Sequence, residues 1–173
     1  ESRFGVAMLN DCKYGHDIHD GVMLLSLHRT PTYPDPEADI GEKTFTYALC
    51  PHEGTLAQSD TVRAAYYLNY PMTAVRATGA ASRIPTAFSA VALDCENVIC
   101  ETVKEEEYGD AIIVRMYECR NIRTRARVTL GFPAKRVTLC DLQERELAEM
   151  TLDGNGFDYT FHGFEITTFK VEI

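Results

Sequence analysis

The chain has 173 residues, of which 45% are hydrophobic and 25% charged, and its formal net charge is −9 at pH 7. This length allows a domain with a buried core, and the composition is typical of a globular protein rather than a disordered one. No segment approaches the roughly 20 consecutive apolar residues of a membrane-spanning helix. The acidic balance also argues against sequence-independent nucleic-acid binding, which depends on Lys and Arg. We therefore expect no membrane and no nucleic acid as partner.

Short apolar and β-branched segments, separated by turn residues, recur along the chain and predict about ten strands. Two groups of turn residues, 107–110 and 153–156, predict hairpin connections because Gly, Asn and Asp tolerate positive φ angles. The pattern predicts an all-β fold, an antiparallel β-sandwich. The predicted strands are 4–9, 22–27, 44–49, 87–93, 98–103, 111–117, 125–130, 136–139, 157–161 and 165–171.

One segment breaks the strand pattern. Val62 and Ala65 begin a series of residues at three- and four-residue spacing, with Asp60 before it as an N-cap and Pro71 just beyond its end. This arrangement predicts one short helix over 61–69.

The segment that follows, 70–86, loses the alternation of strands and is rich in small residues, so we expect a long surface connection. No internal repeat, low-complexity run or second domain boundary is visible. We expect residues 1–173 to form a single β-sandwich domain.

Six cysteines lie in or beside apolar runs. They are too few for a disulfide-dense miniprotein, so we expect reduced thiols. No signal peptide and no Asn-x-Ser/Thr acceptor is visible, which favours an intracellular protein. Because the first residue is Glu1 rather than methionine, we expect a fragment or processed piece of a larger protein.

Two polar clusters follow apolar strands. Asn10, Asp11, Lys13 and Tyr14 offer hydrogen-bond donors, acceptors and an aromatic ring, and Arg29 follows the second predicted strand with a planar guanidinium. This mixture suits carbohydrate, whose hydroxyls need paired donors and acceptors while its C–H faces stack on Tyr. A hydrogen-bonded loop network that only fixes the strand corner explains the residues equally well.

Three carboxylates, Asp35, Glu37 and Asp39, fall within five residues. They could serve as a catalytic acid and base or hold a hard cation. We favour a solvated loop held by Pro34 and Pro36, because the spacing lacks the glycine and terminal glutamate of an EF-hand. A single loop also seldom places two carboxyl groups across a sugar as retaining glycosidases require.

Cys12, His16 and His19 have a spacing that could ligate zinc, but a closed structural site needs four ligands. We favour surface turn histidines. The Cys50-Pro51-His52 tripeptide places a thiol near a base, but adjacent strand residues point to opposite faces, which argues against a nucleophile here.

Arg123, Arg125 and Arg127 alternate, so on a strand they share one face and could bind an anionic ligand. A solvent-facing row is the favoured interpretation, as is a solvated hairpin end for the acidic run 105–107. The sequence shows no Ser-His-Asp order, phosphate-binding glycine loop or HExxH pattern. Nothing here makes a complete active site, and we assign no catalytic residue and no metal ligand.

Several segments, in order and over nearly the whole chain, resemble one known family. They are 5–15, 25–36, 38–42 with 45–49, 65–69 before Pro71, and 163–169. Together they resemble the C-terminal β-domain of family 38 glycoside hydrolases, the retaining α-mannosidases, and most closely the branch with cytosolic, vacuolar and bacterial members.

This resemblance implies a β-sandwich of the galactose-mutarotase-like super-sandwich type within a multidomain, cytoplasmic enzyme. An upstream domain would hold the divalent metal, usually zinc, and both catalytic carboxylates, so this chain alone would be inactive. The implied partners are that upstream catalytic domain and a mannose-containing oligosaccharide, and assembly into a homo-oligomer stays open.

The resemblance also implies supporting roles for residues of this chain at the rim of the active site. Arg29 resembles an arginine used there, and Asn10, Asp11, Lys13 and Tyr14 are expected near the substrate beside it. Loop support is expected from Tyr33, Asp35 and Asp39.

A different class of function stays open: a free-standing β-sandwich module that binds carbohydrate or a protein and takes no part in chemistry. A purely structural role in assembly is a third possibility. The module predicts sugar binding by the isolated chain, whereas an enzyme fragment predicts an exposed apolar patch where the rest of the protein packs.

Overall fold

The computed structural model describes residues 3–76 and 85–173. The chain divides into two compact units, Glu1–Arg76 (unit 1) and Ala77–Ile173 (unit 2). The single domain expected over residues 1–173 stays a prediction. Within the described residues, no helix is long and apolar enough to cross a membrane.

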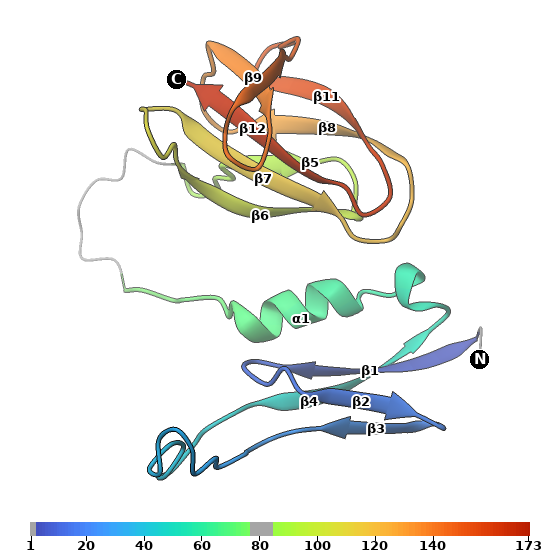
Figure 1. The fold of residues 1–173 in the computed structure, drawn as a ribbon. Helices are drawn as coiled ribbons and strands as arrows, with labels where there is room; N and C mark the ends of the chain where they lie inside the picture. The colour runs from blue at the N-terminus through green and yellow to red at the C-terminus, as the bar shows by residue number, and fades with distance from the viewer. Residues whose placement is uncertain (1–2, 77–84) are drawn as a thin grey trace. The chain divides into compact units, whose positions relative to one another are not determined.

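Unit 1 contains two antiparallel strand pairs and the α-helix (Figure 1). The first and fourth strands pair along their full length, and the second and third form a hairpin that turns at Asp20 and Gly21, both with positive φ. The elements are β1 (Phe4–Asn10), β2 (His16–His19), β3 (Val22–Leu25), β4 (Tyr47–Glu53), the 3-10 helix η1 (Leu56–Gln58) and α1 (Thr61–Asn69).

The predicted helix is confirmed over Thr61–Asn69. Asp60 occupies the N-cap position but forms no side-chain cap hydrogen bond. The hydroxyl of Ser59 instead accepts from the backbone N–H of Thr61 at 3.3 Å. The sequence therefore predicted the position of the N-cap correctly, but it did not identify the Ser59 hydroxyl as the group that accepts a hydrogen bond from the first turn.

Unit 2 contains a five-stranded and a three-stranded antiparallel sheet, with the strand orders β10-β9-β12-β7-β6 and β11-β8-β5 (Figure 1). Its strands are β5 (Val91–Leu93), β6 (Val98–Glu105), β7 (Ile112–Glu118), β8 (Thr124–Leu130), β9 (Arg136–Cys140), β10 (Glu146–Glu149), β11 (Gly156–Phe161) and β12 (Ile166–Glu172).

The core of unit 2 lies between these two sheets. Phe157 and Phe161 of the smaller sheet pack with Phe169 and Met116 of the larger one, and each is at most 1% exposed. The Phe157 and Phe169 ring centroids are 4.8 Å apart at an interplanar angle of 58°, a favourable tilted geometry. The predicted all-β antiparallel sandwich with one short α-helix is confirmed.

One carboxylate is buried at the end of this core. Glu118 is fully buried at the last position of β7 and accepts hydrogen bonds from Asn97 Nδ2 at 2.8 Å and from the backbone N–H groups of Arg120, Ile122 and Phe164 at 2.8, 3.2 and 3.0 Å. Burial alone would raise the pKa of Glu118, but these hydrogen bonds lower it below its usual range. The ionised carboxylate therefore holds the β7–β8 turn against the β11–β12 turn.

Two strands were missed and two were shifted. Every residue of β2 and β10 is exposed, and neither strand has an apolar alternation, so nothing in their sequences signals a strand. β4 begins three residues later than expected, and β5 is confined to Val91–Leu93.

The hairpin predicted at 107–110 joins β6 and β7 and is confirmed. At 153–156 the turn forms, with Asp153 and Gly156 exchanging backbone hydrogen bonds, but β10 and β11 on either side belong to different sheets. The hairpin prediction there is wrong. The expected surface connection 70–86 has no regular structure over 71–76, and its positions 77–84 lie outside the described residues.

Candidate functional site

The first predicted cluster forms a hydrogen-bonded turn between β1 and β2. Asn10 Oδ1 accepts from the backbone N–H of Lys13 at 2.5 Å, and Asn10 Nδ2 lies 3.3 Å from His16 Nε2. Asn69 at the end of α1 donates to the carbonyl of Asn10 at 3.1 Å. Three separate elements of unit 1 therefore meet at this turn.

The same turn is tied to the residues that precede β4. Asp11 accepts from the backbone N–H of Thr46 at 3.0 Å and donates its own N–H to the Thr46 carbonyl at 3.1 Å. Lys13 Nζ lies 4.9 Å from the centroid of the Phe45 ring, a cation–π distance. Hydrogen bonds from the Cys12 side chain and the Thr46 backbone lower the pKa of Asp11, which favours an ionised carboxylate in the turn.

The second cluster starts from this same turn. Ser26, just after β3, donates its N–H to the carbonyl of Gly15 at 2.8 Å. The loop 26–46 thus begins and ends against the 10–15 turn. Arg29 is three residues beyond Ser26, so its Cα lies at most about 11 Å from that of Ser26. The two clusters, separate in sequence, share one end of unit 1.

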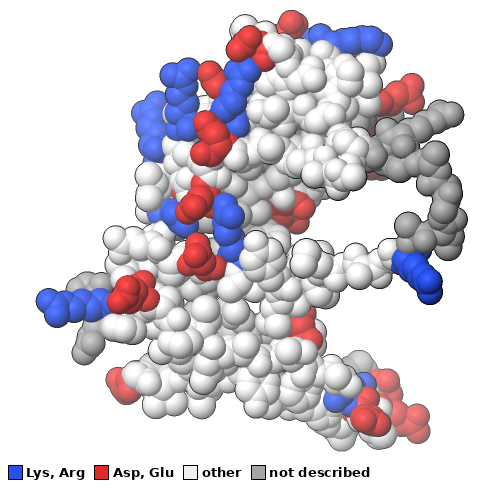
Figure 2. All heavy atoms as spheres, turned by 180° about the vertical axis from the view of Figure 1, so that it is seen from behind, with Lys and Arg blue, Asp and Glu red and all other residues white. Residues whose placement is uncertain are grey.

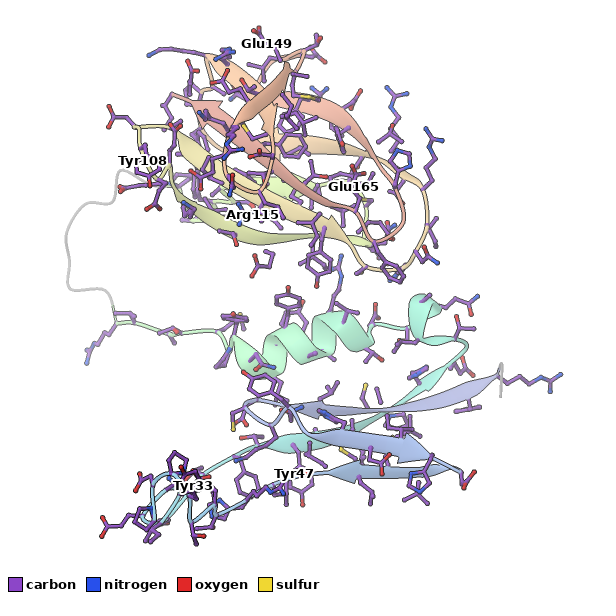
Figure 3. The ribbon with its side chains drawn as sticks, viewed as in Figure 1. Tyr33, Tyr47, Tyr108, Arg115, Glu149 and Glu165 are labelled. Atoms are coloured by element: carbon purple, nitrogen blue, oxygen red, sulfur yellow. The ribbon has the colours of Figure 1, made fainter. Side chains whose placement is uncertain are left out.

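Three side chains of this region are exposed and form no hydrogen bond or ion pair with the described residues. Tyr14 is 92% exposed and Tyr33 87% exposed, and Arg29 is also exposed. Tyr33 stands in the loop between β3 and β4 (Figure 3). An aromatic face and a guanidinium without internal partners are available for a ligand, whereas Asn10 and Asp11 are engaged in holding the turn.

The loop that carries Tyr33 is internally ordered. Asp35 Oδ1 accepts from the backbone N–H of Glu37 at 2.9 Å, and the Asp35 carbonyl accepts from Ala38 at 3.2 Å. Asp39 has a φ of +60° and lies 3.9 Å from Lys43 Nζ. Asp35 fixes the loop by a local turn, and the three carboxylates do not converge.

The described residues contain no group of three or more His, Cys, Asp or Glu side chains that could hold a metal ion. His16 Nδ1 lies 3.1 Å from the Tyr14 carbonyl, and His19 Nδ1 lies 3.2 Å from Asp17 Oδ1. Cys12, His16 and His19, whose spacing could ligate zinc, therefore do not form a metal-binding cluster.

The expectation that the side chains of Cys50 and His52 point to opposite faces of their strand is wrong. They are two positions apart on β4, so they share a face rather than pointing to opposite ones. That face is half-buried, and the His52 ring covers Gly5 on β1, where a Cβ would overlap it. His52 Nδ1 lies 3.4 Å from the Glu53 carbonyl. The pair thus packs within unit 1.

The alternating arginines face carboxylates of the neighbouring strand. Arg125 and Arg127 lie 2.9 Å and 3.6 Å from Asp158 on β11, and Arg127 lies 3.2 Å from Asp153. These ion pairs leave Arg125 and Arg127 little excess charge for an anionic ligand. In the acidic run, Glu106 pairs with Lys170 at 2.5 Å and is only 17% exposed, so it is not a solvated hairpin residue as expected.

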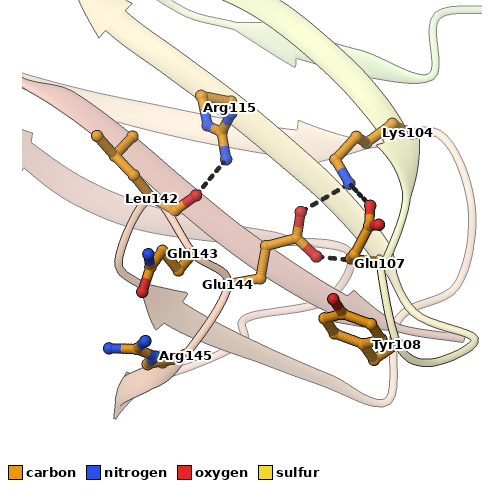
Figure 4. A pocket seen from close by; sticks show the side chains of 8 residues that line it. All are labelled: Lys104, Glu107, Tyr108, Arg115, Leu142, Gln143, Glu144 and Arg145. Carbon is orange, nitrogen blue, oxygen red and sulfur yellow. Dashed lines mark hydrogen bonds and ion pairs between the residues drawn. The ribbon is translucent and has the colours of Figure 1, made fainter.

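Unit 2 has a hollow that sequence reasoning missed (Figure 4). It is lined by Lys104, Glu107, Tyr108, Arg115 and the loop 142–145. Glu144 at a φ of +66° accepts from the Glu107 N–H at 2.8 Å and pairs with Lys104 at 2.6 Å, and Arg115 donates to the Leu142 carbonyl at 3.2 Å. The hydrogen bonds and the Lys104 ammonium lower the pKa of Glu144.

The polar groups of this hollow therefore largely satisfy one another and brace the β9–β10 loop. No local sequence signal could have identified it, because its residues come from three segments brought together only by the sheet.

Comparison with protein families matches both units. The model described as "Glycosyl hydrolases family 38 C-terminal beta sandwich domain" matches residues 97–169, and the "Glycosyl hydrolases family 38 C-terminal domain" matches residues 1–37. The chain belongs to glycoside hydrolase family 38. The match over residues 1–37 includes the 10–15 turn and Arg29, and the match over residues 97–169 includes most of the sandwich of unit 2.

The sequence of this family 38 chain is also similar to those of proteins named as alpha-mannosidases. It is 37% identical over 171 residues to alpha-mannosidase 2C1 of Homo sapiens, covering 96% of this chain and 16% of the relative. It is 32% identical over 180 residues to alpha-mannosidase G of Dictyostelium discoideum, covering 98% of this chain and 16% of the relative. The chain thus spans about one-sixth of the length of these relatives.

The fold of the chain is also similar to that of a solved protein of family 38. The crystal structure of a protein of glycosyl hydrolase family 38 from Enterococcus faecalis matches with a TM-score of 0.80 at 20% identity, over 99% of this chain and 21% of that protein. The all-β fold is therefore shared with a solved member of family 38.

Proposed function

We propose that this chain is the C-terminal domain of a retaining, metal-dependent α-mannosidase that hydrolyses terminal α-mannosyl residues, and that it supports and lines the active site without carrying out the chemistry. The observation that carries the proposal is the 37% identity, over 96% of this chain, to a protein named alpha-mannosidase 2C1. The solved relative described as an alpha-mannosidase from Enterococcus faecalis supports it through the shared fold.

The end of unit 1 at the 10–15 turn is the proposed substrate-proximal surface. Arg29 would donate a planar pair of N–H groups to sugar hydroxyls, and the exposed Tyr14 ring would stack on a sugar C–H face. Asn10, Asp11 and Lys13 would hold the turn, since their polar groups already bond within it. Tyr33, Asp35 and Asp39 would shape the adjoining loop.

The divalent metal, which we expect to be zinc, and the two carboxylates belong in this proposal to the part of the enzyme outside these 173 residues. Retaining hydrolysis needs two carboxyl groups about 5 Å apart across the sugar. The loop carboxylates of unit 1 bond to neighbouring backbone or Lys43 rather than to one another, and the described residues offer no cluster of metal ligands. This chain would therefore position the sugar or brace the loop that does so.

The six free cysteines favour a reducing compartment, and we propose the cytoplasm. A mannose-containing oligosaccharide is the proposed substrate, and assembly into a homo-oligomer stays a prediction.

The test uses the full-length polypeptide that contains this sequence, with 4-nitrophenyl α-D-mannopyranoside as substrate. We expect hydrolysis, loss of activity after treatment with a chelator with recovery on adding Zn²⁺, and initial release of the α-anomer of mannose by NMR. We expect the 173-residue chain alone to be inactive. Initial release of the β-anomer would refute the retaining mechanism. Activity unaffected by the chelator would refute metal dependence. Saturable mannoside binding by the 173-residue chain, with no hydrolysis by the longer protein, would favour the binding module.

A further inference from the structure

The β1–β4 ribbon of unit 1 has two different faces. Residues directly opposite in an antiparallel pair share a face, so the register places Val6 with Pro51 and Met8 with Leu49 on one side. Phe4 and Tyr47 lie on that same side at the two ends of the ribbon. The other side is formed mostly by small residues, with the pairs Gly5 and His52, Ala7 and Cys50, and Leu9 and Ala48.

Helix α1 accounts for the face with small residues. It lies against β1 (Figure 1), and its last residue, Asn69, donates to the Asn10 carbonyl at 3.1 Å. All residues of the face with small side chains are half-buried. Small side chains there allow a helix to approach closely, so this side of the ribbon has its packing partner within unit 1.

The opposite face is apolar and open. Phe4 is 61% exposed, Val6 50%, Leu49 62% and Tyr47 55%. We call the face formed by Phe4, Val6, Met8, Tyr47, Leu49 and Pro51 the open ribbon face; Met8 in it is half-buried, and the polar Asn10, opposite Tyr47, stands at one end of it. Glu53, opposite Phe4, is the charged residue at its edge. On the side of the molecule drawn in Figure 2, the charged side chains of unit 1 lie mainly at its edges, around a surface without them.

This exposure is costly for unit 1. A two-stranded ribbon is marginally stable in water without a packed hydrophobic face. Among the described residues 3–76, no hydrophobic side chain is fully buried, and the two buried residues are Ser59 and Thr61. Unit 2, by contrast, has a complete apolar core. A contiguous exposed apolar patch of this kind marks an interaction surface.

We propose that the open ribbon face packs against a part of the same α-mannosidase polypeptide that lies outside these 173 residues. This inference rests on the proposed function. The length of the relatives favours this occupant over a second copy of the chain. The relatives are about six times longer than the matched region, which is 16% of the human protein, so most of their polypeptide is available to cover the face. The face is also almost free of charge, which is typical of a permanent interface, whether within one polypeptide or between subunits.

The test measures side-chain accessibility at one position of the open ribbon face. Val6→Cys is labelled with a maleimide in the 173-residue chain and in the full-length polypeptide, and the label is assigned by tandem mass spectrometry. Leu147→Cys in β10 is the matched control, since Leu147 is 64% exposed in unit 2. We expect labelling at position 6 to be at least tenfold slower in the full-length polypeptide, and at position 147 to be equal within twofold.

Equal labelling at position 6 in the two proteins would overturn the inference. So would protection that appears in the 173-residue chain as its concentration rises, together with a dimer in sedimentation, because a second copy would then be the occupant. A second variant guards against ambiguity: Leu49→Lys should lower the melting temperature of the full-length polypeptide, while Leu142→Lys, at the same 62% exposure, should not.

Hydrolysis of the aryl mannoside is measured separately on the same preparation. Hydrolysis with fast labelling at position 6 would overturn the interface alone. Slow labelling without hydrolysis would refute the proposed activity and leave the interface standing.

Discussion

The carboxylate of Glu118 accepts a hydrogen bond of 3.0 Å from the backbone N–H of Phe164, forty-six residues away. Phe164 has a φ of +59°, a conformation that non-glycine residues rarely adopt. The turn before β12 therefore has a strained backbone that Glu118 holds in place from the end of β7. Together with the hydrogen bonds from Asn97, Arg120 and Ile122, this contact explains why a buried carboxylate without an ion-pair partner is stable in the sandwich.

Replacing Glu118 with Gln should destabilise unit 2. The substitution keeps the size of the side chain but turns one acceptor into a donor that faces backbone N–H groups. We expect the free energy of unfolding to fall by about 2–4 kcal/mol, measured by urea denaturation. Glu105→Gln, an exposed carboxylate on β6, should change it by less than about 0.5 kcal/mol. Equal effects of the two variants would contradict the role assigned to Glu118.

The contribution of Glu118 should depend on pH. Its folded pKa is lowered, so its stabilisation is complete above the pKa of an ordinary Glu, about 4.3, and is lost as pH falls through the lower folded value. The difference in unfolding free energy between the parent chain and Glu118→Gln should be largest at neutral pH and shrink in acid. A difference that stays constant across this range would show that Glu118 is not ionised in the fold.

Gly163 should be intolerant of a side chain. A Cβ at this position would lie 3.0 Å from the backbone carbonyl carbon of Asn121 and would overlap the oxygen of its side-chain amide. The β7–β8 turn and the β11–β12 turn meet at this point. We expect Gly163→Ala to lower stability by about 1–3 kcal/mol, seen as an earlier urea midpoint. The neighbouring exposed His162→Ala should be neutral, and a neutral Gly163→Ala would mean that the turns separate easily.

The sandwich and its helix were predictable because their signals are local. Apolar alternation in β7 and β12 and the spacing of Val62 and Ala65 directly reflect which side is buried. β10 was not predictable, because all four residues of its sequence, Glu-Leu-Ala-Glu, are exposed and show no apolar alternation. Its strand conformation depends on pairing with β9, where Arg136 bonds to Glu146 and Glu149.

The candidate site was predictable in part. The sequence identified the 10–15 turn and Arg29 as two polar clusters, and the structure shows that the loop carrying Arg29 begins and ends at that turn. The Asp11–Thr46 contact that joins them spans thirty-five residues, so only the folded chain reveals it. The role of Glu118 was missed for the same reason, since its partners come from three separate turns.

Arg29 should matter for catalysis rather than for folding. Its side chain is exposed and forms no hydrogen bond with the described residues, so Arg29→Ala in the full-length polypeptide should leave the melting temperature nearly unchanged. We expect kcat/KM for an aryl α-mannoside to fall about tenfold or more. Arg123→Ala, which removes an exposed arginine from the turn before β8, should not affect it. Equal activity of Arg29→Ala and the parent enzyme would remove Arg29 from the proposed site.

The central claim is that this chain functions as one domain of an α-mannosidase. The most direct measurement is the intact mass of the native polypeptide that contains this sequence, followed through fractionation of its source cells alongside the hydrolysis of 4-nitrophenyl α-D-mannopyranoside. The account predicts that the activity copurifies with a product several-fold heavier than 19.4 kDa. A native product near 19.4 kDa, with the mannosidase activity in other fractions, would contradict it.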